Sequence, residues 1–193
     1  MDTVKLLRFG SLVTITCGVF WAMGAVLLLG NSISIAQVIL LAASILQVFA
    51  ILGLYGAQIK RMGILGMVGF LLVTSGSVIS LVSLAGNLAR FTGANDYLSW
   101  FMLVSTLPLI RLSVLSAAIG FLLFGIETYR AGMLPRWAGG LMSFGGFLIL
   151  LVGFGAVIIL LPAGLILAAA SQIWLGYAVW IEETERIERL RPI

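Results

Sequence analysis

Two long stretches of the 193-residue chain, residues 9–59 and 137–181, contain no charged side chain. An apolar helix needs about 20 residues to cross the hydrocarbon core of a bilayer, so each stretch has room for two crossings. Only 9% of all residues are charged and 62% are hydrophobic, whereas a soluble domain has about 25% charged residues. So few charges cannot cover a surface that faces water. Lipid therefore surrounds most of this chain.

Turn-forming residues divide the apolar stretches into separate spans. Gly30, Asn31 and Ser32 interrupt the first stretch, and Pro162 interrupts the second, because glycine, asparagine and proline favour turns. Loops with basic or polar residues separate the remaining spans. The pattern predicts an all-α fold in one domain, 1–193: a six-helix transmembrane bundle with helices at about 9–29, 34–57, 63–86, 107–128, 137–160 and 163–181.

Two further segments are predicted outside the spans. The apolar region 97–126 is too long for one upright crossing, and Pro108 interrupts it. We therefore expect a short interfacial segment at about 97–106, before the fourth helix. The tail 182–190 places glutamates four residues before arginines, a spacing that stabilises helices. The last helix is thus expected to continue beyond the membrane.

Basic residues gather on one side of this topology. With six spans, both termini lie on the same side, and nine of the eleven basic residues lie there as well. Cytoplasmic loops of membrane proteins carry an excess of Lys and Arg. We therefore predict cytoplasmic termini and a location in the cell (plasma or inner) membrane. The basic residues on this side are Lys5, Arg8, Lys60, Arg61, Arg130, Arg136, Arg186, Arg189 and Arg191.

The stretch 124–147 shows how the chain leaves the membrane and re-enters it. An apolar helix runs out into Glu127 and Arg130, and a second apolar helix begins after a turn at Pro135. Glu127 is the acidic residue at this inner boundary. We expect it to form an ion pair with Arg130 one turn on, or with Arg61 in the neighbouring loop.

The composition excludes several function classes. The chain has no histidine and a single cysteine, Cys17, which removes the usual base of a nucleophile–base pair, histidine-bearing metal sites and an internal disulfide. We therefore expect no enzymatic activity, no metal and no cofactor. The net charge of +4 lies in short loops rather than on one soluble face, so nucleic acid is not an expected partner.

Small residues recur at alternating steps of four and three in two of the predicted helices. This spacing places them along one seam, where helix backbones can approach closely in lipid. We interpret both seams as packing faces within the bundle; a docking face for another subunit is the alternative. The seams contain Gly69, Gly76, Ser80 and Ser83 in the third helix, and Gly139, Ser143, Gly146 and Gly153 in the fifth.

Polar residues within the spans are the candidates for ligand binding. Arg111 is the only charge buried within a predicted span, since Glu127 lies at the inner boundary. About 16 residues of helix separate Arg111 from that boundary, which places it near the outer membrane edge. It either reaches lipid phosphates or binds an anionic head group or carboxylate. Five uncharged polar residues share a depth near the membrane midplane and either line a pocket or join helices by hydrogen bonds. They are Gln47, Thr74, Ser75, Ser116 and Gln172.

The segment Arg130-Ala131-Gly132-Met133-Leu134-Pro135-Arg136-Trp137-Ala138, together with Leu54-Tyr55-Gly56-Ala57 and Gly63 to Phe70, resembles a group of small bacterial membrane proteins with six helices. The resemblance covers helices two to six and implies the fold and a bacterial membrane location. It transfers no catalytic residue. A more distant likeness is to the vitamin-binding S subunits of energy-coupling factor transporters, which are similar in size and helix number.

Two functions are compatible with these observations. The first is a non-enzymatic accessory or scaffold subunit, with the lipid bilayer and other membrane protein subunits as partners. The second is a substrate-binding subunit or carrier for a small neutral or weakly anionic solute, which would use the midplane polar residues with Arg111 at the entrance. A cavity near Gln47 and Gln172 would favour the second function.

Overall fold

The computed structural model describes the backbone of residues 3–91, 108–154 and 160–189. This part of the chain is all-α, and it contains six helices that are long and apolar enough to cross a membrane. Side chains are described for residues 6–84, 108–154 and 160–182. The helices are α1 (Thr3–Leu29), α2 (Ile33–Gln58), α3 (Ile64–Phe91), α5 (Pro108–Ala131), α6 (Arg136–Gly153) and α7 (Leu160–Arg189).

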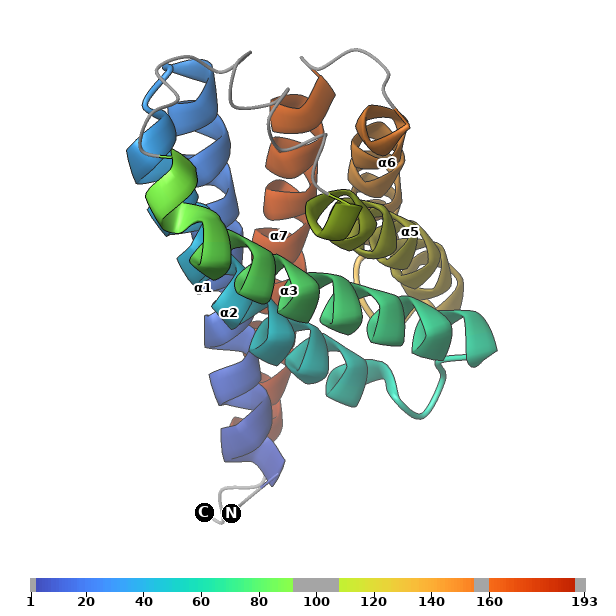
Figure 1. Cartoon of the computed structure of the whole chain (residues 1–193). Coiled ribbons are helices and arrows are strands. Elements are labelled where there is room, and N and C mark those ends of the chain that lie inside the picture. The colour runs from blue at the N-terminus through green and yellow to red at the C-terminus, as the bar shows by residue number, and fades with distance from the viewer. Residues whose placement is uncertain (1–2, 92–107, 155–159, 190–193) are drawn as a thin grey trace.

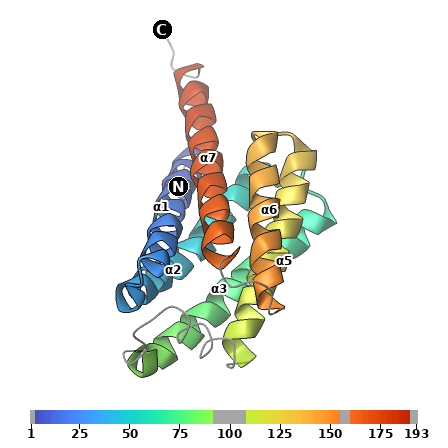
Figure 2. The same cartoon turned by 90° about the horizontal axis from the view of Figure 1, so that it is seen from above.

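The helices form a closed ring. Each helix packs against its neighbours in the chain, and α7 packs against α1, so that the first and last helices lie side by side (Figures 1 and 2). Figure 2 shows α1, α2 and α7 on one side of the ring and α5 and α6 on the other, with α3 running from one side to the other. The ring therefore encloses an interior to which every helix contributes one face.

The start of α1 and the end of α7 lie at one end of the ring, which we call the terminal end (Figure 1). The guanidinium carbon of Arg8 lies 5.2 Å from the ring centroid of Trp180, so the two helices are joined there by a cation–π contact. The end of α2 is at the same level, because Leu7 lies against Gly56. The opposite end, where α1 turns into α2, is called the far end.

The α1–α2 turn forms where glycine and asparagine interrupt the first apolar stretch. The N–H of Ser32 donates to the carbonyl of Leu27 at 2.9 Å, and the N–H of Asn31 donates to that of Leu28 at 3.2 Å. Asn31 has a φ of 61°, and this left-handed residue with its two backbone bonds is the Schellman motif that ends many helices. The predicted break at this turn is confirmed.

Several helix boundaries differ from the predicted ones. The fifth span was predicted to reach residue 160, but α6 ends at Gly153, and α7 begins at Leu160 rather than 163. Pro162 therefore lies inside the first turn of α7, which tolerates proline because its backbone N–H groups have no partner within the helix. Helix α3 continues to Phe91, five residues beyond its predicted end. The predicted interfacial segment 97–106 lies outside the described residues.

The predicted seams of small residues pack mainly against α5. A Cβ atom added to Gly76 of α3 would lie 2.7 Å from the backbone nitrogen of Ala117 in α5. A Cβ atom added to Gly146 of α6 would lie 2.8 Å from the carbonyl oxygen of Ala118 in α5. Real Cβ atoms do not approach backbone this closely, so only glycine permits these two crossings. Gly69 and Gly139 make equivalent contacts with α5.

The remaining seam residues have different surroundings. The hydroxyl of Ser143 donates to the carbonyl of Leu122 in α5 at 3.2 Å and to that of Gly139 at 3.1 Å. Ser80 and Ser83 of α3 line an interior cavity, as does Gly153 at the end of α6. The seams thus combine packing faces with part of a cavity wall.

Candidate ligand-binding cavity

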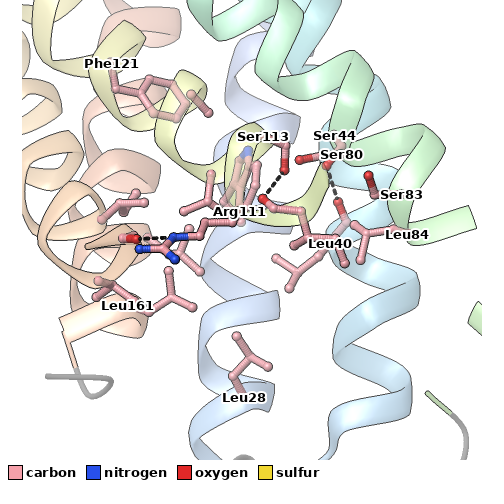
Figure 3. A pocket seen from close by; sticks show the side chains of 18 residues that line it. Leu28, Leu40, Ser44, Ser80, Ser83, Leu84, Arg111, Ser113, Phe121 and Leu161 are labelled. Atoms are coloured by element: carbon pink, nitrogen blue, oxygen red, sulfur yellow. Dashed lines mark hydrogen bonds between the residues drawn. The ribbon is translucent and has the colours of Figure 1, made fainter. Parts of the chain in front are cut away.

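A cavity of about 320 Å³, partly open to the surface, lies between the helices in the half of the ring towards the far end (Figure 3). It lies between the last turns of α1, the first half of α2, the first half of α5 and the end of α6. All six helices of the described chain contribute to it. The lining residues are Trp21, Leu28, Leu40, Ser44, Ser80, Ser83, Leu84, Ile110, Arg111, Ser113, Val114, Ala117, Phe121, Ile149, Val152, Gly153, Leu161 and Leu165.

The cavity wall is predominantly apolar. Leu28, Leu40, Ile110, Ile149 and Leu165 belong to one cluster of buried hydrophobic side chains, which surrounds the cavity from five of the helices. Such a wall favours apolar surface by roughly 25 cal/mol for each Å² removed from water. The lining therefore suits the apolar part of a ligand.

Four serines, Ser44, Ser80, Ser83 and Ser113, also line the cavity, on the side away from the Arg111 guanidinium (Figure 3). The hydroxyl of Ser44 donates to the carbonyl of Leu40 at 2.9 Å, and that of Ser113 donates to the carbonyl of Ile110 at 2.7 Å. These are bonds within the same helix, in which a serine satisfies its own donor. Ser44 and Ser113 therefore direct their hydrogen atoms to backbone rather than into the cavity.

Arg111 is the only charged residue among the described residues that line the cavity. It lies in the first turn of α5, and its exposed side chain reaches the last residue of α6, where Nε donates to the carbonyl oxygen of Gly153 at 3.1 Å. The last carbonyl groups of a helix have no partner within the helix and carry partial negative charge. The end of α6 thus fixes the guanidinium at the cavity.

Gln47 and Gln172 meet in the interior of the ring. The side-chain nitrogen of Gln172 donates to Oε1 of Gln47 at 2.7 Å. The same oxygen accepts a bond from the indole nitrogen of Trp21 at 2.9 Å and one from the thiol of Cys17 at 3.3 Å. Trp21 also lines the cavity, so this network lies directly beside it and joins α1, α2 and α7 across the ring.

The other midplane residues lie elsewhere. The hydroxyl oxygens of Ser75 and Ser116 are 3.2 Å apart, and the hydroxyl of Ser116 donates to the carbonyl of Leu72 at 2.9 Å. Both serines therefore form hydrogen bonds between α3 and α5. Thr74 donates to the carbonyl of Phe70 within its own helix. The five residues predicted at one depth are therefore separated: the two glutamines are buried in the interior, Ser75 and Ser116 lie at the α3–α5 interface, and Thr74 bonds to its own helix.

Glu127 joins α5 to the loop before α3 at the terminal end. Its Oε1 accepts a bond from the backbone N–H of Gly63 at 2.8 Å. Among the described side chains, Glu127 forms no ion pair with Arg61 or Arg130. Gly63 begins the turn into α3, and an unpaired N–H at such a helix start attracts a carboxylate. The loop backbone rather than a basic side chain is thus the partner of this carboxylate.

Three lining residues with a hydrogen-bonding side chain were not among the sequence-based candidates: Trp21, Ser44 and Ser113. Trp21 offered one signal, because a tryptophan far from both predicted ends of a span needs a partner for its N–H group. The two serines offered none, since a serine bonded to its own helix looks the same in sequence as one that faces lipid. No group of three metal-ligating side chains occurs within the described ranges.

Comparison of the chain with protein-family models, with curated proteins and with solved structures finds no match.

Proposed function

We propose that this protein is a multi-pass membrane protein that binds a small, largely apolar solute within its ring of helices, as a binding subunit or carrier. The observation that supports this is the cavity of about 320 Å³ with one cation, Arg111, at its wall. Ligand pockets typically have about 300–1,000 Å³, apolar walls and a few placed polar groups. A helix bundle that only held other subunits together would not need such a space.

The proposal includes an orientation. The start of α1, the end of α7 and the basic loops after α2 and α5 are assigned to the cytoplasmic side of a bacterial inner membrane, on the excess of basic residues. The cavity then lies in the outer half of the bilayer. A solute would reach it from the outer leaflet or from outside the cell.

A variant that fills the cavity tests this function. Ser80 lines the cavity, so Ser80→Phe places a ring inside it. Val78 is 46% exposed on the outside of the same helix, so Val78→Phe adds the same ring to the lipid-facing surface. Molecules that co-purify with each variant in mild detergent would be extracted and identified by mass spectrometry.

We expect a defined compound to accompany the native protein and the Val78→Phe variant, and to be lost from Ser80→Phe. If all three proteins carry the same compounds in equal amounts, the cavity does not bind a solute. The accessory-subunit function would then be the better proposal, since it requires membrane protein partners and no ligand in the cavity.

A further inference from the structure

The guanidinium of Arg111 offers the cavity several hydrogen-bond donors. Arginine has five N–H donors in a rigid fork, and only the Nε donor of Arg111 has a partner among the described residues, the carbonyl of Gly153. This bond holds the guanidinium in place while the donors of both terminal nitrogens are available. Such a fork matches a carboxylate or phosphate, which accepts two parallel hydrogen bonds.

The rest of the cavity offers little to a polar ligand. Among the described residues that line it none is acidic, and two of its four serines, Ser44 and Ser113, donate their hydroxyl groups to backbone carbonyls of their own helices. A ligand with many hydroxyl groups would lose its hydrogen bonds to water without replacement, at about 1–3 kcal/mol for each buried group. A cationic ligand would meet Arg111 and no counter-charge. The lining therefore selects an apolar body with a single anionic group.

We propose that the solute is an acyl chain with an anionic head group, bound with its head at Arg111 and its chain directed inwards to Trp21 and Phe121. This inference rests on the proposed function and narrows its ligand to one chemical class. The volume of about 320 Å³ lies at the lower end of the range for ligand pockets, which suits one chain. Two sources supply a head group of this chemistry, a free carboxylate or the phosphate of a bilayer lipid.

A series of ligands that differ only in the head group tests the class. The native protein is reconstituted in nanodiscs of phosphatidylcholine, and binding of radiolabelled dodecanoate is measured against empty nanodiscs. Dodecanol and dodecyltrimethylammonium compete for the site with the same chain and a neutral or cationic head. We expect dodecanoate to bind about tenfold or more tightly than dodecanol, as a charge-assisted bond predicts, and the cationic analogue not to compete.

The result distinguishes the two proposals. If dodecanol binds as tightly as dodecanoate, the cavity takes apolar chains but the anionic class is wrong, and the proposed function stands. If none of the three compounds binds, both the inference and the function fall. If nanodiscs that contain phosphatidylglycerol suppress dodecanoate binding, the head group comes from a bilayer lipid; if they do not, it comes from a free carboxylate.

Variants test the role of Arg111. In Arg111→Gln the preference for dodecanoate over dodecanol is expected to disappear, whereas Arg111→Lys keeps the charge and should retain part of it. Arg136→Gln removes a charge at the terminal end and should leave the preference unchanged. If Arg136→Gln lost the preference for dodecanoate to the same extent as Arg111→Gln, the overall charge of the protein rather than this site would attract the anion, and the inference would be wrong.

The direction of the chain has its own measurement. Dodecanoate with bromine on its last carbon should quench Trp21 fluorescence more strongly than dodecanoate brominated next to the carboxylate, because Trp21 lines the cavity. The Trp21 signal is the difference between the native protein and Trp21→Phe. Stronger quenching by the compound brominated near the head would reverse the proposed orientation.

Discussion

Gln47 occupies the most connected position among the buried polar side chains of the described interior. It is 1% exposed, and its Oε1 accepts hydrogen bonds from Trp21, Gln172 and Cys17. A buried donor that loses its acceptor costs about 1–3 kcal/mol, because no water replaces it. Replacing Gln47 would therefore leave the donors of α1 and α7 unpaired together.

The two glutamines of this network are expected to differ in their effect on stability. Gln47→Leu leaves the indole N–H of Trp21 and the amide of Gln172 without their acceptor. Gln172→Leu removes one donor from an oxygen that keeps two others. Each variant also removes one buried amide atom without a partner, Nε2 of Gln47 or Oε1 of Gln172, so this effect does not distinguish them. We predict that Gln47→Leu is more destabilising than Gln172→Leu by about 1–3 kcal/mol.

Unfolding in mixed micelles of a mild detergent and SDS measures this difference. The double variant gives the control, because once Gln47 is absent the loss of Gln172 should cost nothing further or restore stability. Equal destabilisation by the two single variants would show that the network does not centre on the oxygen of Gln47.

The contact between these glutamines could be predicted only in part. Their depth follows from counting residues along each predicted span, and both were placed near the midplane. Their adjacency depends on α7 lying beside α1 and facing α2, and neither residue carries a signal for that. Glu127 illustrates the same limit, since its position at the boundary was predictable but its partner, the N–H of Gly63, belongs to a loop backbone.

At the scale of the elements, α5 has a special place in the ring because glycines bring its backbone into contact with both neighbours. Gly120 of α5 packs against Val73 of α3, and Gly125 packs against Ser143 of α6. Lipid provides no hydrophobic drive between apolar helices, so close backbone contact and dispersion hold such pairs together. Loss of a glycine at these crossings must push two helices apart.

A matched pair of glycine variants tests this packing. A Cβ atom at Gly76 would lie 2.7 Å from the backbone of Ala117, whereas one at Gly140 would meet nothing within 4 Å. We predict that Gly76→Ala destabilises the protein by about 1–3 kcal/mol, as overpacking does. Gly140→Ala should be neutral or stabilise by up to about 1 kcal/mol, because alanine is the better helix former.

Thermal unfolding in one detergent, followed by circular dichroism, compares these glycine variants. A Gly76→Ala protein as stable as Gly140→Ala would mean that α3 can shift away from α5 at no cost. The close crossing would then be incidental rather than required.

The number and approximate extent of the helices were predictable because uncharged runs and charged loops alternate clearly. The residues at which individual helices begin and end were harder to predict. The sequence pattern predicts a break at Pro162, but this residue lies in the first turn of α7, where proline is as acceptable as in a loop. Composition does not separate these two uses of proline. The end of α6 at Gly153 had no sequence signal that distinguished it from the apolar residues that follow.

At the scale of the whole molecule, the ring places the loops 59–63 and 132–135 at the same end as the start of α1. Met62 and Leu134 belong to one hydrophobic cluster there. The basic residues Lys60, Arg61, Arg130 and Arg136 lie in or beside these loops and therefore at the same end of the ring. The cavity is the part of the molecule that could not be predicted, because its walls are ordinary apolar residues brought together only by ring closure.

Cysteine labelling tests the proposed orientation. Cys17 is buried and is the only cysteine, so Cys17→Ala provides a background without thiols. Single cysteines are then added to this background and labelled in cells with a membrane-impermeant maleimide. We expect Ser32→Cys to react in intact cells, and Arg61→Cys to react only after the cells are permeabilised. The reverse pattern would place the termini outside and the cavity in the inner half of the bilayer.

The contact between α1 and α7 has a consequence for biogenesis. Gly18 packs against Ala169 and Ile173, and Gly176 packs against Ser11 and Ile15. The first helix of the bundle to be synthesised, α1, therefore cannot complete its packing until the last helix, α7, has been synthesised. Until α7 inserts, the ring of helices is open, and its inner face, including Gln47, is exposed to lipid. The cavity between the helices can close only when the final span inserts, which makes its completion the last step in the assembly of the six helices.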